Sequence, residues 1–258
     1  MKAALLENRN EGGFGIRDID DPVPTTGNAI MRVRASSLNR VDIYLRDNGS
    51  GITHNFPLIL GVDGVGEIID CQPESGLRSG DRVALYSSSF CGSCRYCLAG
   101  EQPLAGARVF GTSSTDEKIA KALSLGAEGG VNYRTGKVAK EILEMTGGEG
   151  VDMVIDSVGE ASWGESLRSL RRGGRIVTCG ATTGSNPPVE IQRMFIRQLQ
   201  LYGSTGANMN EMRQLFSLVA TGRLQPVIDS IFPLKDISKA FDRLASGQQF
   251  GKVAVSID

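Results

Sequence analysis

The chain of 258 residues is 40% hydrophobic and 22% charged, which is ordinary for a globular protein with one large or two small domains. Its formal net charge of -1 gives no electrostatic basis for binding nucleic acid or an anionic membrane. The longest apolar runs are far shorter than a membrane span, and the first residues lack the hydrophobic core of a signal peptide. We therefore expect a cytoplasmic protein with neither nucleic acid nor membrane as its partner.

Short strands separated by turns fill the N-terminal portion. We expect them over residues 2–6, 29–35, 64–69 and 81–86, with Gly, Pro and Asp residues between them. Strands at this spacing, without long helical patterns between most of them, indicate a small β-barrel or sandwich.

Three of the five cysteines, Cys91, Cys94 and Cys97, lie within seven positions. This spacing is tight enough for three thiolates to wrap one Zn²⁺, and an odd number of cysteines argues against a disulfide framework. A structural zinc site usually has four protein ligands, so three would leave a position for water or a borrowed group. The alternative interpretation is three free thiols on a loop.

The second half alternates between strand and helix patterns. Apolar runs over residues 108–113, 151–158 and 175–180 end at Gly or small hydroxyl residues. Residues 114–117 fit a helix capping box, and Gly126 lies where a left-handed helix end is expected. This alternation predicts a parallel sheet covered by helices. The expected buried helix stripes are Val138, Ile142 and Met145 in one helix and Trp163, Leu167 and Leu170 in the next.

Several of these segments together resemble the medium-chain dehydrogenase/reductase superfamily, above all its zinc-type alcohol dehydrogenase and quinone oxidoreductase branches. They are residues 117–128, 132–133, 154–159 and 173–180. The resemblance implies an α/β protein with a GroES-like β-barrel domain over residues 1–104, completed by 225–258. Residues 105–224 would form a Rossmann-type, doubly wound parallel sheet.

One part of that family pattern is absent. No G-x-G-x-x-G occurs anywhere in the sequence, and about eighty residues are missing after Leu104 by comparison with a complete doubly wound domain. The missing part would contain the first strand of the sheet and its glycine-rich turn. In the strand order 3-2-1-4-5-6 this strand is central, so the two halves must either close up or leave apolar edges open.

The resemblance also bears on catalysis. Asn39 and Val62 stand where zinc-dependent relatives carry a cysteine and a histidine, and valine cannot coordinate a metal. We therefore expect no catalytic zinc. In metal-free relatives, residues at the Asn39 and Tyr44 positions lie near the nicotinamide, so both are candidates for orienting substrate. Alternatively, Asn39 is a turn residue and Tyr44 a half-buried packing group.

Residues 112–115, at the end of the second sheet strand, carry no acid that could hold the ribose hydroxyls of NAD, which favours NADP(H). The resemblance implies that one group of residues binds the adenosine end of the cofactor and that a second group binds its ribose and nicotinamide end. It also implies that Lys252 can reach the cofactor. The first group is Ser113, Ser114, Lys118 and Tyr133, and the second is Val158, Gly159, Gly180 and Ala181. The alternatives are a solvated Lys118 and glycines that serve only as turns.

The function implied by the resemblance is an NADPH-dependent oxidoreductase. It would pass hydride to a small quinone, enone or aldehyde without catalytic zinc, as a homodimer joined through the last strand of the sheet. The alternative is an inactive or incomplete derivative of the family that has lost cofactor binding, because the glycine-rich turn that lets a pyrophosphate approach a helix N-terminus is missing.

The cysteine cluster gives a first prediction. In protein purified from zinc-replete medium, Cys94→Ser should lower the zinc content, because two remaining thiolates are too few for a structural site. Metal analysis by mass spectrometry measures this. Any reductase activity should be almost unchanged at first, since the cysteine lobe of relatives lies away from the active site. Stoichiometric zinc in the variant would contradict the assignment.

Overall fold

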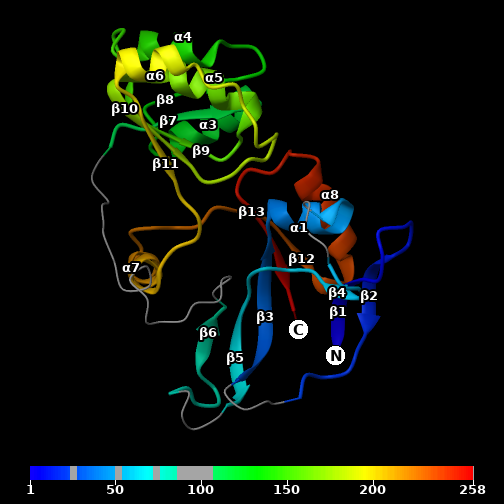
Figure 1. The fold of residues 1–258 in the computed structure, drawn as a ribbon. Coiled ribbons are helices and arrows are strands. Elements are labelled where there is room, and N and C mark those ends of the chain that lie inside the picture. Colours follow the sequence, from blue (N-terminus) through cyan, green and yellow to red (C-terminus); the bar gives the residue numbers. More distant parts are fainter. Residues whose placement is uncertain (24–27, 50–53, 72–75, 86–106, 258) are drawn as a thin grey trace. The chain divides into compact units, whose positions relative to one another are not determined.

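The computed structural model describes residues 1–23, 28–49, 54–71, 76–85 and 107–257. The chain forms two compact units, one made of residues 1–98 and 212–258 and the other of residues 99–211 (Figure 1). The domain limits expected at 104 and 224 stay a prediction. Within the described ranges, no helix is long and apolar enough to cross a membrane.

The first unit contains two antiparallel-rich sheets. In the smaller one, β1 (Lys2–Leu6) lies between β2 (Phe14–Asp18) and β4 (Leu58–Ile59). The larger sheet has the order β12-β13-β3-β5-β6. Its strands are β12 (Ile228–Pro233), β13 (Lys252–Ser256), β3 (Ile30–Leu38), β5 (Val65–Asp70) and β6 (Arg82–Ala84). Helices α1 (Arg40–Asp47) and α8 (Ile237–Ala245) complete the unit, with a 3₁₀ turn at Leu234–Asp236 before α8.

The core of this unit is built around α8. Its buried residues Ile237, Ala240, Phe241 and Leu244 follow the i, i+3, i+4, i+7 spacing of one helix face. They belong to one cluster with apolar residues of β1, β3 and β13. Since β13 comes from the C-terminal segment and pairs with β3, both chain segments are needed to complete this core.

One ion pair fixes α8 to β12. Arg243 donates two hydrogen bonds of 2.9 Å to the Asp229 carboxylate, and the Phe250 amide donates a third, also 2.9 Å. The Arg243 guanidinium holds the pKa of Asp229 well below its ordinary value, although partial burial opposes this. The carboxylate is therefore ionised at neutral pH and joins α8, β12 and the segment before β13.

The second unit alternates strands and helices as expected. Its elements are β7 (Phe110–Ser113), α3 (Asp116–Ser124), β8 (Gly129–Asn132), α4 (Val138–Met145), β9 (Val151–Asp156), α5 (Glu160–Ser169), β10 (Leu170–Thr178), α6 (Ile191–Arg197) and β11 (Gln200–Gly203). Helix α7 (Met209–Ala220) follows where the chain passes from this unit to the first one. All the strand pairs of the second unit are parallel.

Its parallel sheet is divided into two parts. Strands β7 and β8 form one pair, while β9, β10 and β11 form a separate sheet in the order β11-β10-β9. In the described residues β7 does not pair with β9, so the position between them is the one that the missing central strand would fill. Of the two outcomes expected from the sequence, the sheet therefore shows the open one. Met153 and Ile155 on β9 are 49% and 70% exposed.

Helices hold the two parts of this unit together. Helix α4, which covers β8, packs against α5, which covers β9 and β10. The amide of Ala139 at the start of α4 donates a 2.8 Å hydrogen bond to the Glu165 carboxylate on α5. The buried residues Trp163, Leu167, Leu170 and Ile176 form the core between α5 and its sheet.

Three local expectations need correction. Met145 is 37% exposed, and the buried residues of α4 are Ala139 and Ile142. Leu170 is fully buried but begins β10 instead of lying on the helix stripe of Trp163 and Leu167. The N-cap of α3 is Thr115 rather than Ser114, since the Thr115 hydroxyl accepts from the Lys118 amide at 3.3 Å. A lysine at that third helical position cannot return the second bond of a capping box. The positive φ of Gly126, +103°, confirms the expected left-handed helix end.

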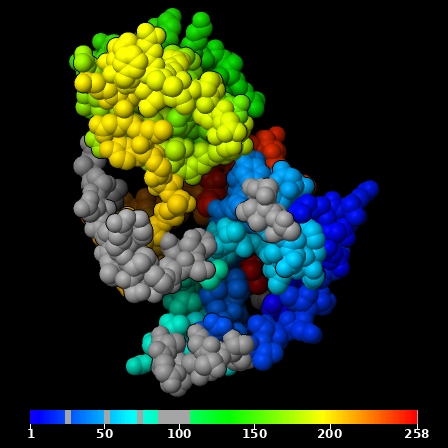
Figure 2. All heavy atoms as spheres, in the orientation of Figure 1, coloured from blue at the N-terminus to red at the C-terminus, as the bar shows by residue number. Residues whose placement is uncertain are grey.

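An apolar surface lies along α6 and β11. Figure 2 shows α6, in yellow, on the surface of its unit, and several large apolar side chains of this region are exposed. They are Ile191, Phe195, Ile196, Leu201 and Tyr202. This surface includes the strand through which the family resemblance would join a homodimer, and that dimer stays a prediction.

The open edge of β9 predicts a specific source of aggregation. Ile155→Lys should slow aggregation, because a charge on an exposed strand edge opposes pairing with another chain. The free energy of unfolding should change by less than about 0.5 kcal/mol, since the side chain is largely exposed. Light scattering and urea unfolding measure the two quantities. The matched control is Val23→Lys, at a residue 80% exposed and outside any strand, and equal effects of both variants would refute the edge as the cause.

Candidate functional site

Four predicted adenosine-end residues lie at one edge of the second unit, where β7 and β8 end. Ser113 is the last residue of β7, and the Tyr133 amide after β8 donates to its carbonyl oxygen at 3.0 Å. Ser114 leads into α3, and Lys118 lies in the first turn of that helix. The carboxyl ends of parallel strands are where open α/β sheets bind ligands, so the placement fits the expectation.

An acidic residue at this edge was missed in the sequence. Asp116 is the first residue of α3, and its carboxylate accepts a 2.8 Å hydrogen bond from the Asn132 side-chain amide at the end of β8. The amide is neutral, so the carboxylate keeps its charge and repels a phosphate group nearby. Lys118 and Asp116 at this edge therefore have opposite effects on the binding of an NADP phosphate.

The other strand-end edge of the unit is organised by Asp156, the last residue of β9. The amides of Val158 and Gly159 donate to one carboxylate oxygen at 2.8 and 2.9 Å. The hydroxyls of Ser162 and Ser166 donate to the other oxygen at 2.7 and 2.6 Å. The carboxylate thus fixes the turn between β9 and α5, on which two of the predicted cofactor residues lie.

Asp156 is only 3% exposed, but it is a stable anion. Burial alone would raise the pKa of its carboxyl, yet the hydrogen bonds from Ser166, Gly159, Ser162 and Val158 together lower it. All four donors are hydrogen-bonded to the ionised carboxylate. Protonation of Asp156 would weaken these hydrogen bonds and loosen the turn between β9 and α5.

The predicted glycines pack against neighbouring backbone. Gly159 has φ +87°, and a Cβ there would lie 2.5 Å from the Gly184 carbonyl oxygen. A Cβ on Gly180 would lie 2.8 Å from the Ser157 carbonyl oxygen. The loop after β10 therefore lies directly on the turn after β9. This close approach brings Val158, Gly159, Gly180 and Ala181 together at one edge and explains why glycine is needed at two of them.

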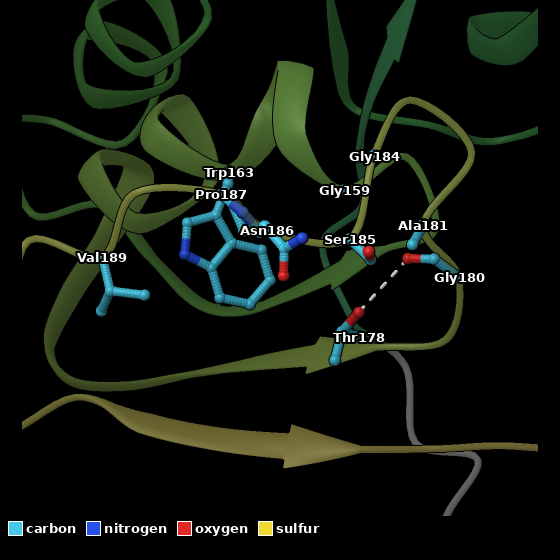
Figure 3. Close-up of a pocket in the computed structure, with 10 residues that line it drawn as sticks. All are labelled: Gly159, Trp163, Thr178, Gly180, Ala181, Gly184, Ser185, Asn186, Pro187 and Val189. Atoms are coloured by element: carbon cyan, nitrogen blue, oxygen red, sulfur yellow. Dashed lines mark hydrogen bonds between the residues drawn. The ribbon is translucent and has the colours of Figure 1, made fainter.

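A pocket of about 410 Å³ opens beside this contact (Figure 3). It is lined by the beginning of α5, the end of β10 and the loop that follows β10. Gly159, Gly180 and Ala181 contribute to its wall. The indole of Trp163 lies across the pocket in Figure 3, and the Thr178 hydroxyl donates to the Gly180 carbonyl oxygen at 3.4 Å.

In the first unit, Asn39 belongs to a polar cluster centred on Asp63. The Asn39 side-chain amide donates to the Asp63 carboxylate at 2.9 Å, as do the hydroxyl and amide of Ser37 at 2.6 and 2.7 Å. Burial raises the pKa of Asp63, but these donors, with the hydroxyl of Ser36, outweigh it and lower the pKa overall. Asp63 is therefore an anion that fixes the orientation of the Asn39 amide.

Lys252 joins the same cluster from β13. Its ammonium donates to the Asn39 side-chain oxygen at 2.5 Å, across a separation of 213 residues. Beneath it, the Asp42 carboxylate accepts from the Asn39 backbone amide at 2.7 Å and is completely buried. Burial and the neighbouring Asp63 raise the pKa of Asp42. The structure thus brings Asn39 and Lys252 together, with both ends of the Asn39 side chain engaged.

The structure gives less information on the remaining predicted residues, which are Tyr44 and the three clustered cysteines. Tyr44 is half-buried on α1, and its role as a substrate-orienting residue stays a prediction. Cys91, Cys94 and Cys97 lie outside the described residues. Within the part of the chain that the structure describes, no three His, Cys, Asp or Glu side chains gather closely enough to hold a metal ion.

Two family profiles match overlapping parts of the chain. The profile described as alcohol dehydrogenase GroES-like domain matches residues 25–142, and the one described as zinc-binding dehydrogenase matches residues 103–221. The chain belongs to the medium-chain dehydrogenase/reductase superfamily. Membership confirms the α/β class, with a GroES-like domain and a Rossmann-like sheet, and places the chain in a family of oxidoreductases.

Curated relatives match along all or half of their length. Acryloyl-coenzyme A reductase of Metallosphaera sedula is 24% identical over 333 positions, which cover 99% of this chain and all of the relative. As this chain has only 258 residues, the alignment must contain a long gap in it, in agreement with an internal deletion. Quinone oxidoreductase 1 of Escherichia coli is 36% identical over 55% of this chain and 46% of its own.

Solved structures confirm the fold. An NAD-dependent alcohol dehydrogenase has a TM-score of 0.90 at 24% identity, with both chains fully covered. The quinone oxidoreductase of Pseudomonas syringae has a TM-score of 0.81 at 22% identity, with 99% of each chain covered. At these identities the likeness shows the fold alone.

The role of Asp156 predicts how this edge responds to substitution and acid. Asp156→Asn should lower the free energy of unfolding by about 2 kcal/mol, since an amide replaces a buried acceptor of charge-assisted hydrogen bonds. Because folding lowers the pKa of Asp156, the stabilisation by its carboxylate is complete above about pH 4. It is lost as the pH falls through the pKa of Asp156 in the folded protein. Urea unfolding followed by Trp163 fluorescence at pH 7 and at pH 3 measures both effects.

The control for this variant is Asp152→Asn on the same strand. Asp152 pairs with Arg171 at 2.6 Å but is 82% exposed, so its replacement should cost less than about 1 kcal/mol. If the Asp152 and Asp156 variants were equally destabilised at pH 7, the anchoring role of Asp156 would be wrong.

Proposed function

We propose that the chain is an NADPH-dependent oxidoreductase that reduces a quinone, enone or aldehyde without catalytic zinc. The observation that carries the proposal is the gathering of the predicted cofactor residues at two strand-end edges of one unit, one for each end of a dinucleotide. Relatives named for 2-haloacrylate, acryloyl-CoA and crotonyl-CoA reduction and for quinones support this substrate class.

At the adenosine end, Lys118 is proposed to face the extra phosphate of NADP. An ammonium forms charge-assisted hydrogen bonds with phosphate, and the hydroxyls of Ser113 and Ser114 add neutral ones. Tyr133, which is 55% exposed, presents a ring on which adenine can stack. The Asp116 carboxylate acts against this preference, so the net selectivity depends on which charge lies nearer the phosphate.

At the other edge, the backbone around Val158, Gly159, Gly180 and Ala181 is proposed to hold the ribose and nicotinamide. When bound, the nicotinamide supplies the hydride chemistry, and the chain supplies alignment. Asp156 fixes the turn that carries Val158 and Gly159, so the backbone groups there are preorganised.

In the first unit we propose Asn39 and Tyr44 as substrate-orienting residues and Lys252 as a further cofactor contact. Asp63 and Lys252 hold the Asn39 side-chain amide in one orientation. Any substrate contact of Asn39 would therefore be with an amide whose orientation is fixed. A cytoplasmic homodimer with a structural zinc on Cys91, Cys94 and Cys97 remains part of the proposal.

A second candidate function is favoured by the divided sheet. In the described residues the facing edges of β7 and β9 are unpaired. The sequence also contains no G-x-G-x-x-G, so the turn that would place a pyrophosphate at a helix N-terminus is missing. In this alternative the chain is an incomplete derivative that binds NADPH weakly or not at all. It would also be marginally stable and prone to aggregate.

A thermal-shift titration with NADPH and NADH, run beside an assay of enone and quinone turnover, separates the two. The reductase proposal expects a melting temperature that rises by several degrees at micromolar NADPH, with turnover. The incomplete derivative expects neither. Equal affinity for both cofactors would show that the end of β7 does not select NADP.

The residue test is Lys118→Ala. It should weaken NADPH binding about tenfold and leave NADH binding unchanged, because one charge-assisted bond to the extra phosphate is lost. The matched control is Lys121→Ala on the same helix, where the ammonium pairs with Glu117 at 2.9 Å. An equal loss in both variants would indicate a general effect of helix charge.

A further inference from the structure

Helix α7 (Met209–Ala220) carries an apolar face that the rest of the described chain leaves uncovered. Met212, Leu215, Phe216 and Val219 follow the i, i+3, i+4, i+7 spacing of a single helix face. Leu215, Phe216 and Val219 are 41%, 48% and 38% exposed, and no residue of α7 is buried. No described helix or strand packs extensively on this helix. We call these four residues the α7 stripe.

A helix of this length needs a packed face to be stable. Isolated helices shorter than about 12–15 residues are marginal in water, and α7 has 12 residues. Its first turn is capped, because Asn208 Oδ1 accepts from the Glu211 amide at 3.0 Å and the Glu211 carboxylate accepts from the Asn208 amide at 2.6 Å. Such caps bury no apolar surface. By contrast, α8 has a similar stripe and buries it in the core of its unit. The α7 stripe therefore indicates a partner surface.

That partner surface must be apolar and narrow. The α7 stripe covers two helical turns, about 10 Å along the axis. A ridge of side chains of this kind packs well into the groove of another helix that carries a similar stripe. A second copy of α7 supplies the same residues, and a two-fold axis between the copies would cover both stripes at once.

Charges at the two ends of α7 determine how a second copy would lie. Glu211 is the acidic residue of the first turn. Arg223 follows the last turn and stays near it, because its amide donates to the Leu218 carbonyl oxygen at 2.9 Å. A parallel copy would bring equal charges together at each end. An antiparallel copy, with the two-fold axis near Ser217, brings Glu211 of each helix beside Arg223 of the other and also opposes the helix dipoles favourably.

We propose that α7 is a self-association surface, at which two copies of the chain pair antiparallel through the α7 stripe. One helix of 12 residues from each copy makes an interface of less than about 1,200 Å², the size class of weak and transient complexes. The pairing should therefore have a micromolar dissociation constant and respond to protein concentration. It goes beyond the proposed function, because it uses neither the cofactor edges nor the β11 strand of the proposed homodimer.

Hydrogen exchange measured by mass spectrometry on the unmodified protein tests the pairing locally. Raising the protein concentration about 100-fold through the micromolar range should slow exchange of the α7 amides about threefold or more, because pairing opposes local opening of the helix. The internal control is α3, which also has no buried residue and should exchange equally at both concentrations.

A variant in the α7 stripe should remove the pairing. Phe216→Glu should weaken self-association, measured by sedimentation velocity, about tenfold or more, because it places a charge in the centre of an apolar contact. The concentration dependence of α7 exchange should disappear with it. The matched control is Phe195→Glu on α6, which changes a phenylalanine that is 67% exposed and should leave α7 exchange as in the unmodified protein.

Charge variants test the antiparallel arrangement. Arg223→Glu should weaken self-association about fivefold, because both Glu211–Arg223 pairs become repulsive. Glu211→Gln in the same chain should then recover part of the affinity, since the amide removes the repulsion and its oxygen can still accept the capping bond from Asn208. Arg223 is exposed, so this pair of variants still decides if Phe216→Glu fails to fold.

Three results would overturn the proposal. The first is exchange of the α7 amides that is independent of protein concentration. The second is an equal effect of Phe216→Glu and Phe195→Glu on α7 exchange, which would show unspecific apolar association. The third is unchanged or stronger self-association of the Arg223→Glu variant, which would contradict antiparallel pairing.

Discussion

A parallel strand in the middle of a sheet needs hydrogen-bonding partners on both sides, and this requirement governs the second unit. Among the described residues, β7 and β9 each lack a partner on the edge that faces the missing strand. Each buried backbone group left unpaired costs about 1 to 3 kcal/mol. The α4–α5 contact holds the two parts in one unit but cannot supply those hydrogen bonds. Both strand-end edges stay ordered because each is carried by two strands that pair with each other, β7 with β8 and β9 with β10.

Buried carboxylates organise both candidate regions locally. Asp156 collects four donors from the turn and helix that follow β9, and Asp63 collects donors from β3 and Asn39. Each is an anion although burial disfavours its charge, because donors from the chain compensate for the lost water. Since these contacts lie within one unit, neither depends on the central strand.

Strand β1 and the β-α-β order could be predicted because turn residues and apolar periodicity are local signals. Helix α8 carries an equally regular stripe, so the same local signal could have predicted it. Leu170 shows the limit of periodicity, since a buried leucine suits the last turn of a helix as well as the first residue of a strand. The strand-end edges were predictable because open α/β sheets bind ligands at the carboxyl ends of their strands. The hydrogen-bond clusters centred on Asp63 and Asp156 were not predictable. Their donors are set by tertiary packing, and Asn39 meets Lys252 only after 213 residues.

The pairing of β3 with β13 has a consequence for the order in which the chain can fold during synthesis. The inserted second unit, residues 99–211, is complete before β13 leaves the ribosome, whereas the first unit must wait for the final segment. Until then, one edge of β3 and the apolar residues that later pack on α8 lack their C-terminal partners. The nascent chain therefore carries an unfinished sheet through the synthesis of a whole second unit, which makes it a natural client for chaperones that shield strand edges.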